Sequence, residues 1–437
     1  MQEFFIHYLW QFQYFDKKQL QTTAKEDLEV IAVGHANPNA GADFTQACVI
    51  INGIKWYGNV EIHLNTSDWL LHQHHKNQDY DNVILHVVWE DDLNDTQKIK
   101  RKDDSPIPTL TLKERVDKLL VEKYYLLLSN KQDMILCATQ ISNVKPITIL
   151  SMLDKVLIQR LQRKAKEVVD LLDSNRGDWE TTTYLWTAQS FGFKVNNEAF
   201  LRLAKALPYL IIAKYTENLL ALEALIFGQA GFLSEKTESS DAYFDKLAKE
   251  YAYLSHKHQL QASGLAKHEW KFLRLRPANF PTIRLAQFAQ LLHKKKSLFN
   301  AFTQTENFEQ LYQFLDIQQS DYWQKHYTFG KESQGKIIGL GKQSIANLII
   351  NTVVPLLVAY GNQKDNPSFI DRAIYFLEQI HAEKNHILSA WEKVGIKAQN
   401  AFDSQALIEL YNHYCLEERC LQCNIGISLL SNNLPLS

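Results

Sequence analysis

The feature that most constrains the fold is a pair of strand-like segments joined by Asn52-Gly53. The Asn-Gly pair readily adopts the positive φ angles of a two-residue hairpin turn. The next segment, residues 60–64 (VEIHL), alternates apolar and polar side chains, which is typical of a half-buried strand. We therefore expect a β-sheet with Glu61 and His63 on the same face.

More strands and a helix are predicted around this hairpin. Residues 28–33 and 83–89 are apolar and rich in β-branched side chains, and residues 109–112 (TLTL) follow Pro-Ile-Pro and are expected to return to the sheet. Apolar residues at helical spacing in residues 2–15 predict a short helix that covers the sheet. The charged residues 91–105 are predicted to form a hairpin tip or a loop.

Histidines are concentrated beside the hairpin. A Thr-Ser-Asp sequence typical of a helix N-cap precedes them, so His72, His74 and His75 are expected on a helix, with His72 and His75 on one face. That pair could contact a phosphate group, although a polar helix surface is the simpler interpretation. His86 interrupts an apolar strand, where a histidine usually only satisfies a hydrogen bond. Its strand is nevertheless expected to neighbour that of His63.

The order strand, Asp43, strand, hairpin, strand with Glu-x-His, helix and strand resembles the core of the restriction-endonuclease-like phosphodiesterases, PD-(D/E)xK. The resemblance implies that Asp43 and Glu61 bind Mg²⁺ or Mn²⁺, which activates water for phosphodiester cleavage. It also implies that His63, where that superfamily usually has Lys, positions or deprotonates the water. Neighbouring histidines shift the expected preference toward Mn²⁺ or Zn²⁺. The turn-rich residues 34–43 would form the lip of the site.

A second interpretation stays open for the same residues. Glu61 and His63 are also what the solvated face of a half-buried strand would carry. The missing lysine and the near-neutral charge of −2 favour this interpretation. The chain would then be a non-catalytic scaffold, or a nucleic-acid-binding protein with a decayed nuclease-like core.

The rest of the chain is predicted to be helical. A long amphipathic helix is expected at residues 149–172, and its Lys and Arg residues suit a nucleic-acid contact or, more simply, a solvated face. We predict an α+β fold, with a mixed α/β nuclease-like domain at residues 1–140. A larger all-helical domain with a C-terminal cysteine cluster is expected at residues 141–437.

An arginine-rich segment interrupts the helical pattern at residues 270–284 (WKFLRLRPANFPTIR). Arg274, Arg276 and Arg284 could clamp phosphate groups of a substrate, and the segment's aromatic residues could stack on bases. An internal ion-pair junction between helices is an equal alternative, because arginine serves both purposes.

Three cysteines lie close together near the C-terminus, with the spacing C-x₄-C-x₂-C: Cys415, Cys420 and Cys423. Such thiolates suit an Fe–S cluster or zinc, and the fourth ligand would be His413, Cys137 or Cys48. The arrangement is similar to nucleases of the helicase–nuclease type, in which C-terminal cysteines hold a cluster beside the catalytic core. Reduced cysteines on a buried helix are the alternative.

Composition narrows the cellular setting. Five cysteines in 437 residues do not form a disulfide framework, which favours a reduced, cytoplasmic protein. A pI of 6.7 excludes a uniformly basic nucleic-acid coat but not a local basic cleft. The most apolar run, residues 345–360, contains two Asn and a Pro, so we expect no membrane span.

Several phrases together are similar to an uncharacterised bacterial family known as a domain of unknown function: GADF, GNVEIH, SDW, NVILHVV, FGQAGFL, RLRPANFP, INTVVP and CLQCNIG. That family supplies no activity. The resemblance of the N-terminal core to restriction-endonuclease-like enzymes implies a metal-dependent phosphodiesterase acting on nucleic acid, with Asp43, Glu61 and His63 as its catalytic residues. The sequence leaves the oligomeric state open.

Overall fold

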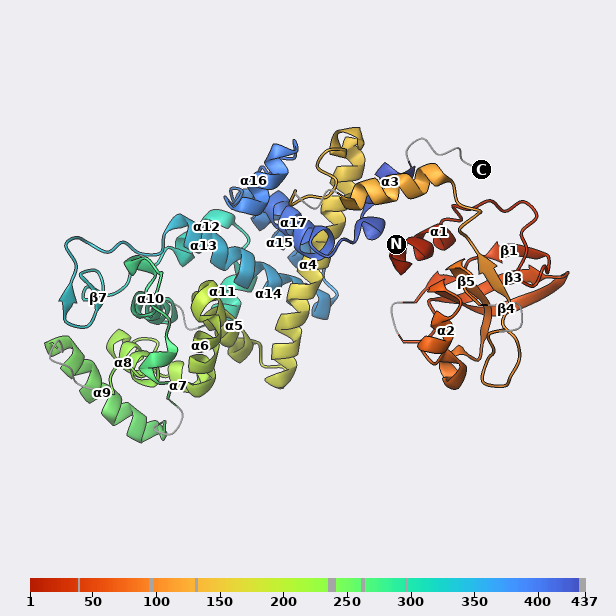
Figure 1. The fold of residues 1–437 in the computed structure, drawn as a ribbon. Coiled ribbons are helices and arrows are strands. Elements are labelled where there is room, and N and C mark those ends of the chain that lie inside the picture. The colour runs from red at the N-terminus through yellow and green to blue at the C-terminus, as the bar shows by residue number, and fades with distance from the viewer. Residues whose placement is uncertain are drawn as a thin grey trace. The chain divides into compact units, whose positions relative to one another are not determined.

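The computed structural model describes residues 1–37, 40–93, 98–129, 133–234, 241–260, 264–294 and 297–431 (Figure 1). Residues 38–39 of the predicted lip and residues 94–97 of the predicted loop lie outside them. The chain divides into two compact units. The sheet unit comprises Met1–Met152, Lys393–Gly395 and Leu410–Ser437, and the helical unit comprises Leu153–Glu392 and Ile396–Glu409. A mixed sheet in one and helices in the other confirm the predicted α+β class.

The sheet has six strands in the order β1-β3-β4-β5-β6, with β2 paired to β3. The β3–β4 pair is antiparallel, whereas β5 is parallel to both β4 and β6. The strands are β1 (Leu28–Ala32), β2 (His35–Ala36), β3 (Phe44–Ile51), β4 (Ile54–Asn65), β5 (Val83–Glu90) and β6 (Thr109–Thr111).

The predicted hairpin joins β3 to β4. Asn52 and Gly53 have φ angles of 48° and 81°, the left-handed conformations that a tight hairpin turn requires. The strands predicted at residues 28–33, 83–89 and 109–112 are confirmed as β1, β5 and β6.

The helix α1 (Glu3–Gln11) covers one face of the sheet, as predicted. The ring of Phe5 lies 6.3 Å from that of Trp89 in β5. Ile62 of β4 is paired with Val87 of β5, and Val87 and Trp89 point to the same face because they are two positions apart. Trp89 therefore shares its face with Ile62. Glu61 and His63 therefore lie on the opposite face.

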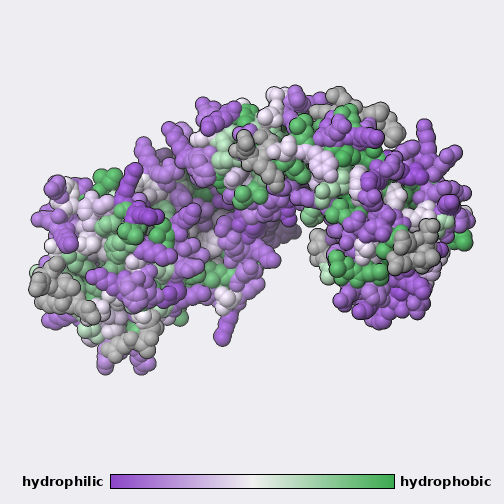
Figure 2. Space-filling model, in the orientation of Figure 1, coloured by the Kyte–Doolittle hydropathy of each residue, from purple (hydrophilic) through white to green (hydrophobic). Residues whose placement is uncertain are grey.

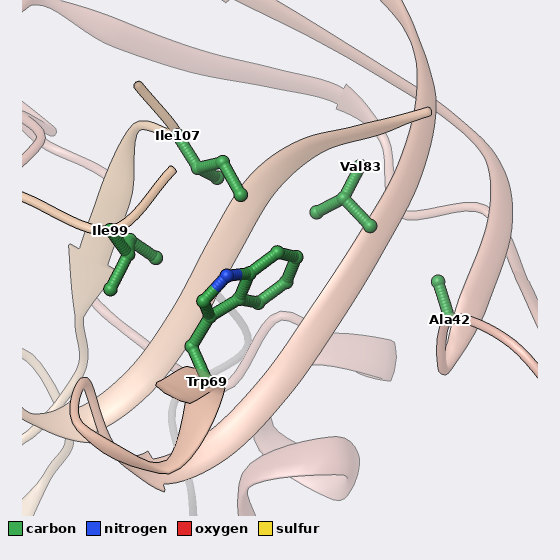
Figure 3. Packing of buried hydrophobic residues seen from close by; sticks show 5 residues of the cluster. All are labelled: Ala42, Trp69, Val83, Ile99 and Ile107. Carbon is green, nitrogen blue, oxygen red and sulfur yellow. The ribbon is translucent and has the colours of Figure 1, made fainter. Parts of the chain in front are cut away.

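Short helical turns follow β4 on that opposite face: α2 (Asp68–Leu71), η1 (His74–Lys76) and η2 (Gln78–Tyr80). Trp69 anchors them, because its fully buried indole donates a hydrogen bond to the Lys100 carbonyl oxygen at 3.0 Å. Figure 3 shows this ring among the apolar side chains Ala42, Val83, Ile99 and Ile107. Truncation of such a buried aromatic residue typically costs about 3–5 kcal/mol, so this anchor is strong.

The C-terminal residues belong to the sheet unit. The helix α18 (Asn424–Ser431) contacts α3 (Lys118–Ser129) and η3 (Ile141–Asn143). Two short turns precede it, η7 (Tyr411–Cys415) and η8 (Cys420–Gln422).

The long helix predicted at residues 149–172 is confirmed as α4 (Pro146–Ser174). On its basic face, Arg160 and Arg163 form ion pairs with Glu409 at 3.4 and 2.8 Å. The next helices are α5 (Trp179–Phe191), α6 (Phe193–Ala206), α7 (Tyr209–Ile212), α8 (Leu219–Gln229), α9 (Ala242–His258), α10 (Pro281–Lys294), α11 (Leu298–Gln304) and α12 (Phe308–Leu315). After the hairpin of β7 (His326–Thr328) and β8 (Lys331–Glu332) come α13 (Lys342–Leu348), α14 (Val354–Lys364), α15 (Ser368–Gln379), α16 (His386–Lys393) and α17 (Ala401–Leu410).

A helical stretch at Lys342–Lys364 is apolar enough to cross a membrane by length and composition. It runs through α13, a π-helical turn (Ile349–Val353) and α14. Within the structure, 72% of its apolar window is buried, so protein side chains cover most of it. The molecular face drawn in Figure 2 is mainly hydrophilic, with scattered hydrophobic patches.

The helical unit contains a buried carboxyl group, Glu223 of α8, which accepts hydrogen bonds from Tyr243 and from Ser320 (2.7 Å). Burial raises its pKa to about 7. The contribution of Glu223 to stability is therefore fully present below the ordinary glutamate pKa of 4.5 and is lost as the pH rises to about 7, because the carboxyl group of the unfolded chain ionises first. The unfolding free energy of the wild-type protein should decrease between pH 5 and pH 8 as Glu223 ionises. In Glu223→Gln we expect this decrease to be smaller by about 2–3 kcal/mol. Urea unfolding at the two pH values measures this, and an unchanged pH dependence would contradict it.

Candidate metal centre

Two carboxylates meet where β3 begins beside β4. The Asp43 amide donates a hydrogen bond to Glu61 Oε2 at 3.1 Å, and the Ile62 amide donates to Asp43 Oδ2 at 2.9 Å. Each carboxylate is thus tied to the backbone of the strand that carries the other. The alternation of β4 also brings His63 to the side of Glu61. The structure therefore brings the predicted residues Asp43, Glu61 and His63 together.

The face that carries Glu61 and His63 is not solvated. Glu61 is 4% exposed and His63 is 2% exposed. This excludes the interpretation of both residues as the outer surface of a half-buried strand. A buried acid and a buried imidazole need partners, and other histidines provide them.

The prediction of one continuous helix through the histidines is wrong. The helix α2 ends at Leu71, and Gln73 then adopts a left-handed conformation with φ 59°. This residue redirects the chain, so the pair that faces the site is His72 and His74 rather than His72 and His75.

Three ligand atoms form a small triangle at the centre of this face. Glu61 Oε1 lies 3.5 Å from His63 Nε2 and 3.3 Å from His74 Nε2, and the two imidazole nitrogens are 3.3 Å apart. Ligands of a tetrahedral zinc ion, each about 2.0–2.1 Å from the metal, lie roughly 3.3–3.4 Å from one another. The triangle therefore matches three corners of a tetrahedral site.

A third histidine lies beside this triangle. His72 Nδ1 is 3.1 Å from His63 Nε2, and the ligand atoms of His63, His72 and His74 all lie within 4.8 Å of one another. His63 Nε2 thus faces an oxygen and two nitrogens, although a neutral imidazole nitrogen carries at most one proton to donate. A cation would accept the lone pairs of all these atoms at once.

His86 supports His63 from behind. The parallel pairing of β4 and β5 places His86 Nε2 2.8 Å from His63 Nδ1. If His63 carries its proton on Nδ1 and donates it to His86, its Nε2 lone pair points into the triangle. The Trp69 ring packs edge-on against His74 and His86, which fixes both imidazoles.

The protonation states suit metal binding. Burial lowers the pKa of His63 to about 2 and that of His74 to about 4, so both imidazoles are neutral near pH 7. Burial, and then the charge of Asp43, raises the pKa of Glu61 to about 9. A bound cation would stabilise the ionised carboxylate and displace its proton.

Two residues of α1 border the site. His7 Nε2 lies 3.5 Å from Asp43 Oδ2 and 3.7 Å from Glu3 Oε1. His72, by contrast, is exposed. The three residues of the triangle are buried, and exposed His72 marks the side of the site that is nearest to solvent.

The predicted arginine segment belongs to the helical unit. Arg284 of α10 is 6% exposed, donates hydrogen bonds to Gln287 and Asn279, and lies over the Phe193 ring. Arg276 and Arg284 both line a cavity of 460 Å³, and Arg274 is not among the residues that line it. These contacts make Arg284 part of an internal junction, while Arg276 is left facing the cavity.

The cysteines form a separate group. Cys415, Cys420 and Cys423 lie in the sheet unit, as does Cys137. All five cysteines are free, and Cys48 lies in β3. Of the fourth ligands considered for the cysteine triplet, Cys137 is the one whose thiol interacts with all three of these thiols.

Sequence reasoning missed several residues of the centre. The role of His74 depends on the turn at Gln73, and no signal for that turn is evident in the sequence. Glu3 and His7 lie in the segment predicted as an amphipathic helix, and their proximity to Asp43 is set by packing of α1 on the sheet.

Comparisons with known proteins place the chain in a family without giving it an activity. No curated protein and no solved structure matches the chain. One family model matches residues 3–386, which covers most of the chain and includes the whole candidate metal centre. The chain belongs to this family, whose description is protein of unknown function (DUF2851).

Proposed function

We propose that the chain is a metal-dependent phosphodiesterase that acts on nucleic acid. The observation that carries the proposal is the triangle of Glu61 Oε1, His63 Nε2 and His74 Nε2, with edges of 3.3–3.5 Å. Two histidines and one carboxylate with an open fourth position are the ligand set of catalytic zinc in several hydrolases. Imidazole ligands favour Zn²⁺ or Mn²⁺ over Mg²⁺.

The surrounding residues have distinct tasks in this proposal. The ion would polarise a phosphate oxygen and lower the pKa of a bound water molecule. His72, at the exposed side, is placed to orient that water or to accept its proton. Asp43 holds the β3–β4 junction through the Ile62 amide and adds negative charge beside Glu61. His86 keeps the imidazole of His63 oriented.

The strand order supports a phosphodiester substrate. Asp43 precedes β3, the hairpin leads to Glu61 on β4, and a short helical segment leads to the parallel strand β5. This order of elements resembles that of the restriction-endonuclease-like enzymes. The rival proposal is a scaffold that binds nucleic acid without cleaving it.

The test is a cleavage assay on single- and double-stranded DNA and RNA with Zn²⁺, Mn²⁺ or Mg²⁺ added to chelator-treated protein. We expect cleavage with Zn²⁺ or Mn²⁺, and its loss in His74→Ala. The matched control is His75→Ala, which removes a neighbouring histidine outside the ligand group. If the wild-type protein cleaves none of these substrates with any of the three ions, the scaffold interpretation replaces the enzyme.

A further inference from the structure

A second cluster of metal-ligating side chains lies in the sheet unit, built from two parts of the chain that are far apart in sequence. Cys137 precedes η3, and Cys423 directly precedes α18, which packs against η3 and α3. The Asn424 amide also contacts Met152 Sδ at 3.4 Å. These contacts hold the C-terminal segment next to the segment that carries Cys137.

Tight turns position the three C-terminal cysteines. Cys415 ends a π-helical turn, a rare conformation that is frequent at functional sites. Glu418 has a left-handed φ of 54°, which turns the chain back toward Cys420. A Cβ atom at Gly426 would lie 2.2 Å from the Cys420 carbonyl oxygen, so glycine is required there for α18 to approach the turn.

Three of the four cysteines are buried, and Cys415 is partly exposed. Cys137, Cys420 and Cys423 are each 8% exposed. Burial, and then the neighbouring thiols, raises the pKa of Cys137 to about 12 and raises the pKa of Cys415 and Cys420. Every pair among the four cysteines interacts electrostatically in this way.

From this arrangement we propose that Cys137, Cys415, Cys420 and Cys423 together bind a metal centre, either a zinc ion or an Fe–S cluster. Four sulfur ligands with no nitrogen or oxygen donor select these two centres. A cation would also reverse the protonation of the thiols, because metal binding deprotonates cysteine outright.

The alternative is a group of reduced cysteines that only fill apolar space. Cys48 shows that ordinary case, since it is buried in β3 and is paired across the hairpin with Tyr57. The cluster differs because four thiols from two distant segments converge on one place. A bound centre would cross-link residues 137 and 415–423 and so fasten the C-terminal segment to the sheet unit.

The test uses full-length His63→Ala protein, purified without oxygen, so that metal at the histidine site does not contribute. We expect one zinc per chain, or iron with acid-labile sulfide and absorbance near 400 nm. The two results distinguish a zinc ion from a cluster. The proposal would be overturned if the protein contained no zinc and no iron in stoichiometric amount.

Cys137→Ala in the same background identifies the fourth ligand. We expect at least a five-fold loss of bound metal, whereas Cys48→Ala should retain it. Unchanged metal content in Cys137→Ala would overturn the four-cysteine site. If Cys137→Ala fails to fold, X-ray absorption spectra of the His63→Ala protein decide: a shell of sulfur alone supports the site, and nitrogen or oxygen ligands contradict it.

Discussion

Glu61→Gln is expected to lower kcat/KM for metal-dependent cleavage by about 1,000-fold, roughly 4 kcal/mol of transition-state stabilisation. The carboxylate supplies one of three corners of the triangle, and it is the negatively charged one when a cation is bound. A neutral amide is a much weaker ligand for a divalent ion. Metal affinity and activation of the bound water should therefore be lost together.

The fold should survive this substitution. The high pKa of Glu61 means that its carboxyl is neutral in the metal-free protein, and glutamine reproduces that neutral shape. The amide oxygen can still accept the hydrogen bond from the Asp43 amide. The matched control is Glu90→Gln on β5, because Glu90 is half exposed and forms a surface ion pair with Lys113. Cleavage at the wild-type rate by Glu61→Gln would show that the carboxylate is not part of the catalytic site.

His63→Lys is expected to abolish metal binding as well as cleavage. His63 Nε2 takes part in both ligand groups, with Glu61 and His74 and with His72. A protonated ammonium cannot coordinate a cation, and it would repel one. We expect the zinc dissociation constant to rise by at least 100-fold in calorimetric titration.

The proposed resemblance to restriction-endonuclease-like enzymes makes this substitution informative, because those enzymes usually have a lysine at the corresponding point of their pattern. If His63 only positioned water, His63→Lys would keep its metal and part of its activity. His35→Lys on β2 is the control, since His35 is exposed in the same sheet. Retained metal in His63→Lys would therefore contradict the triangle as the ligand set.

The local features of this fold could be read from the sequence. Asn52-Gly53 dictates its hairpin through backbone conformation alone, and the alternation in residues 60–64 places Glu61 and His63 on one face. The strand at residues 83–89 was recognisable from its β-branched run. Periodicity also predicted α4 closely.

The features that create the site depend on long-range packing. Burial of the Glu61 face follows from Trp69 and its apolar neighbours, which come from four segments of the sheet unit. The direction of His74 depends on one left-handed residue, Gln73, for which neither glycine nor asparagine gave a signal. The approach of Cys137 to the C-terminal cysteines depends on the return of the C-terminal segment to that unit. None of these is a property of a short sequence window.

The most direct measurement is a crystal structure of the zinc-loaded protein, with anomalous scattering recorded on both sides of the zinc absorption edge. We predict an anomalous peak within about 2.0–2.2 Å of Glu61 Oε1, His63 Nε2 and His74 Nε2. A solvent oxygen or His72 would occupy the fourth position. Crystals that bind zinc elsewhere but show no peak between these three atoms would contradict the proposed metal centre.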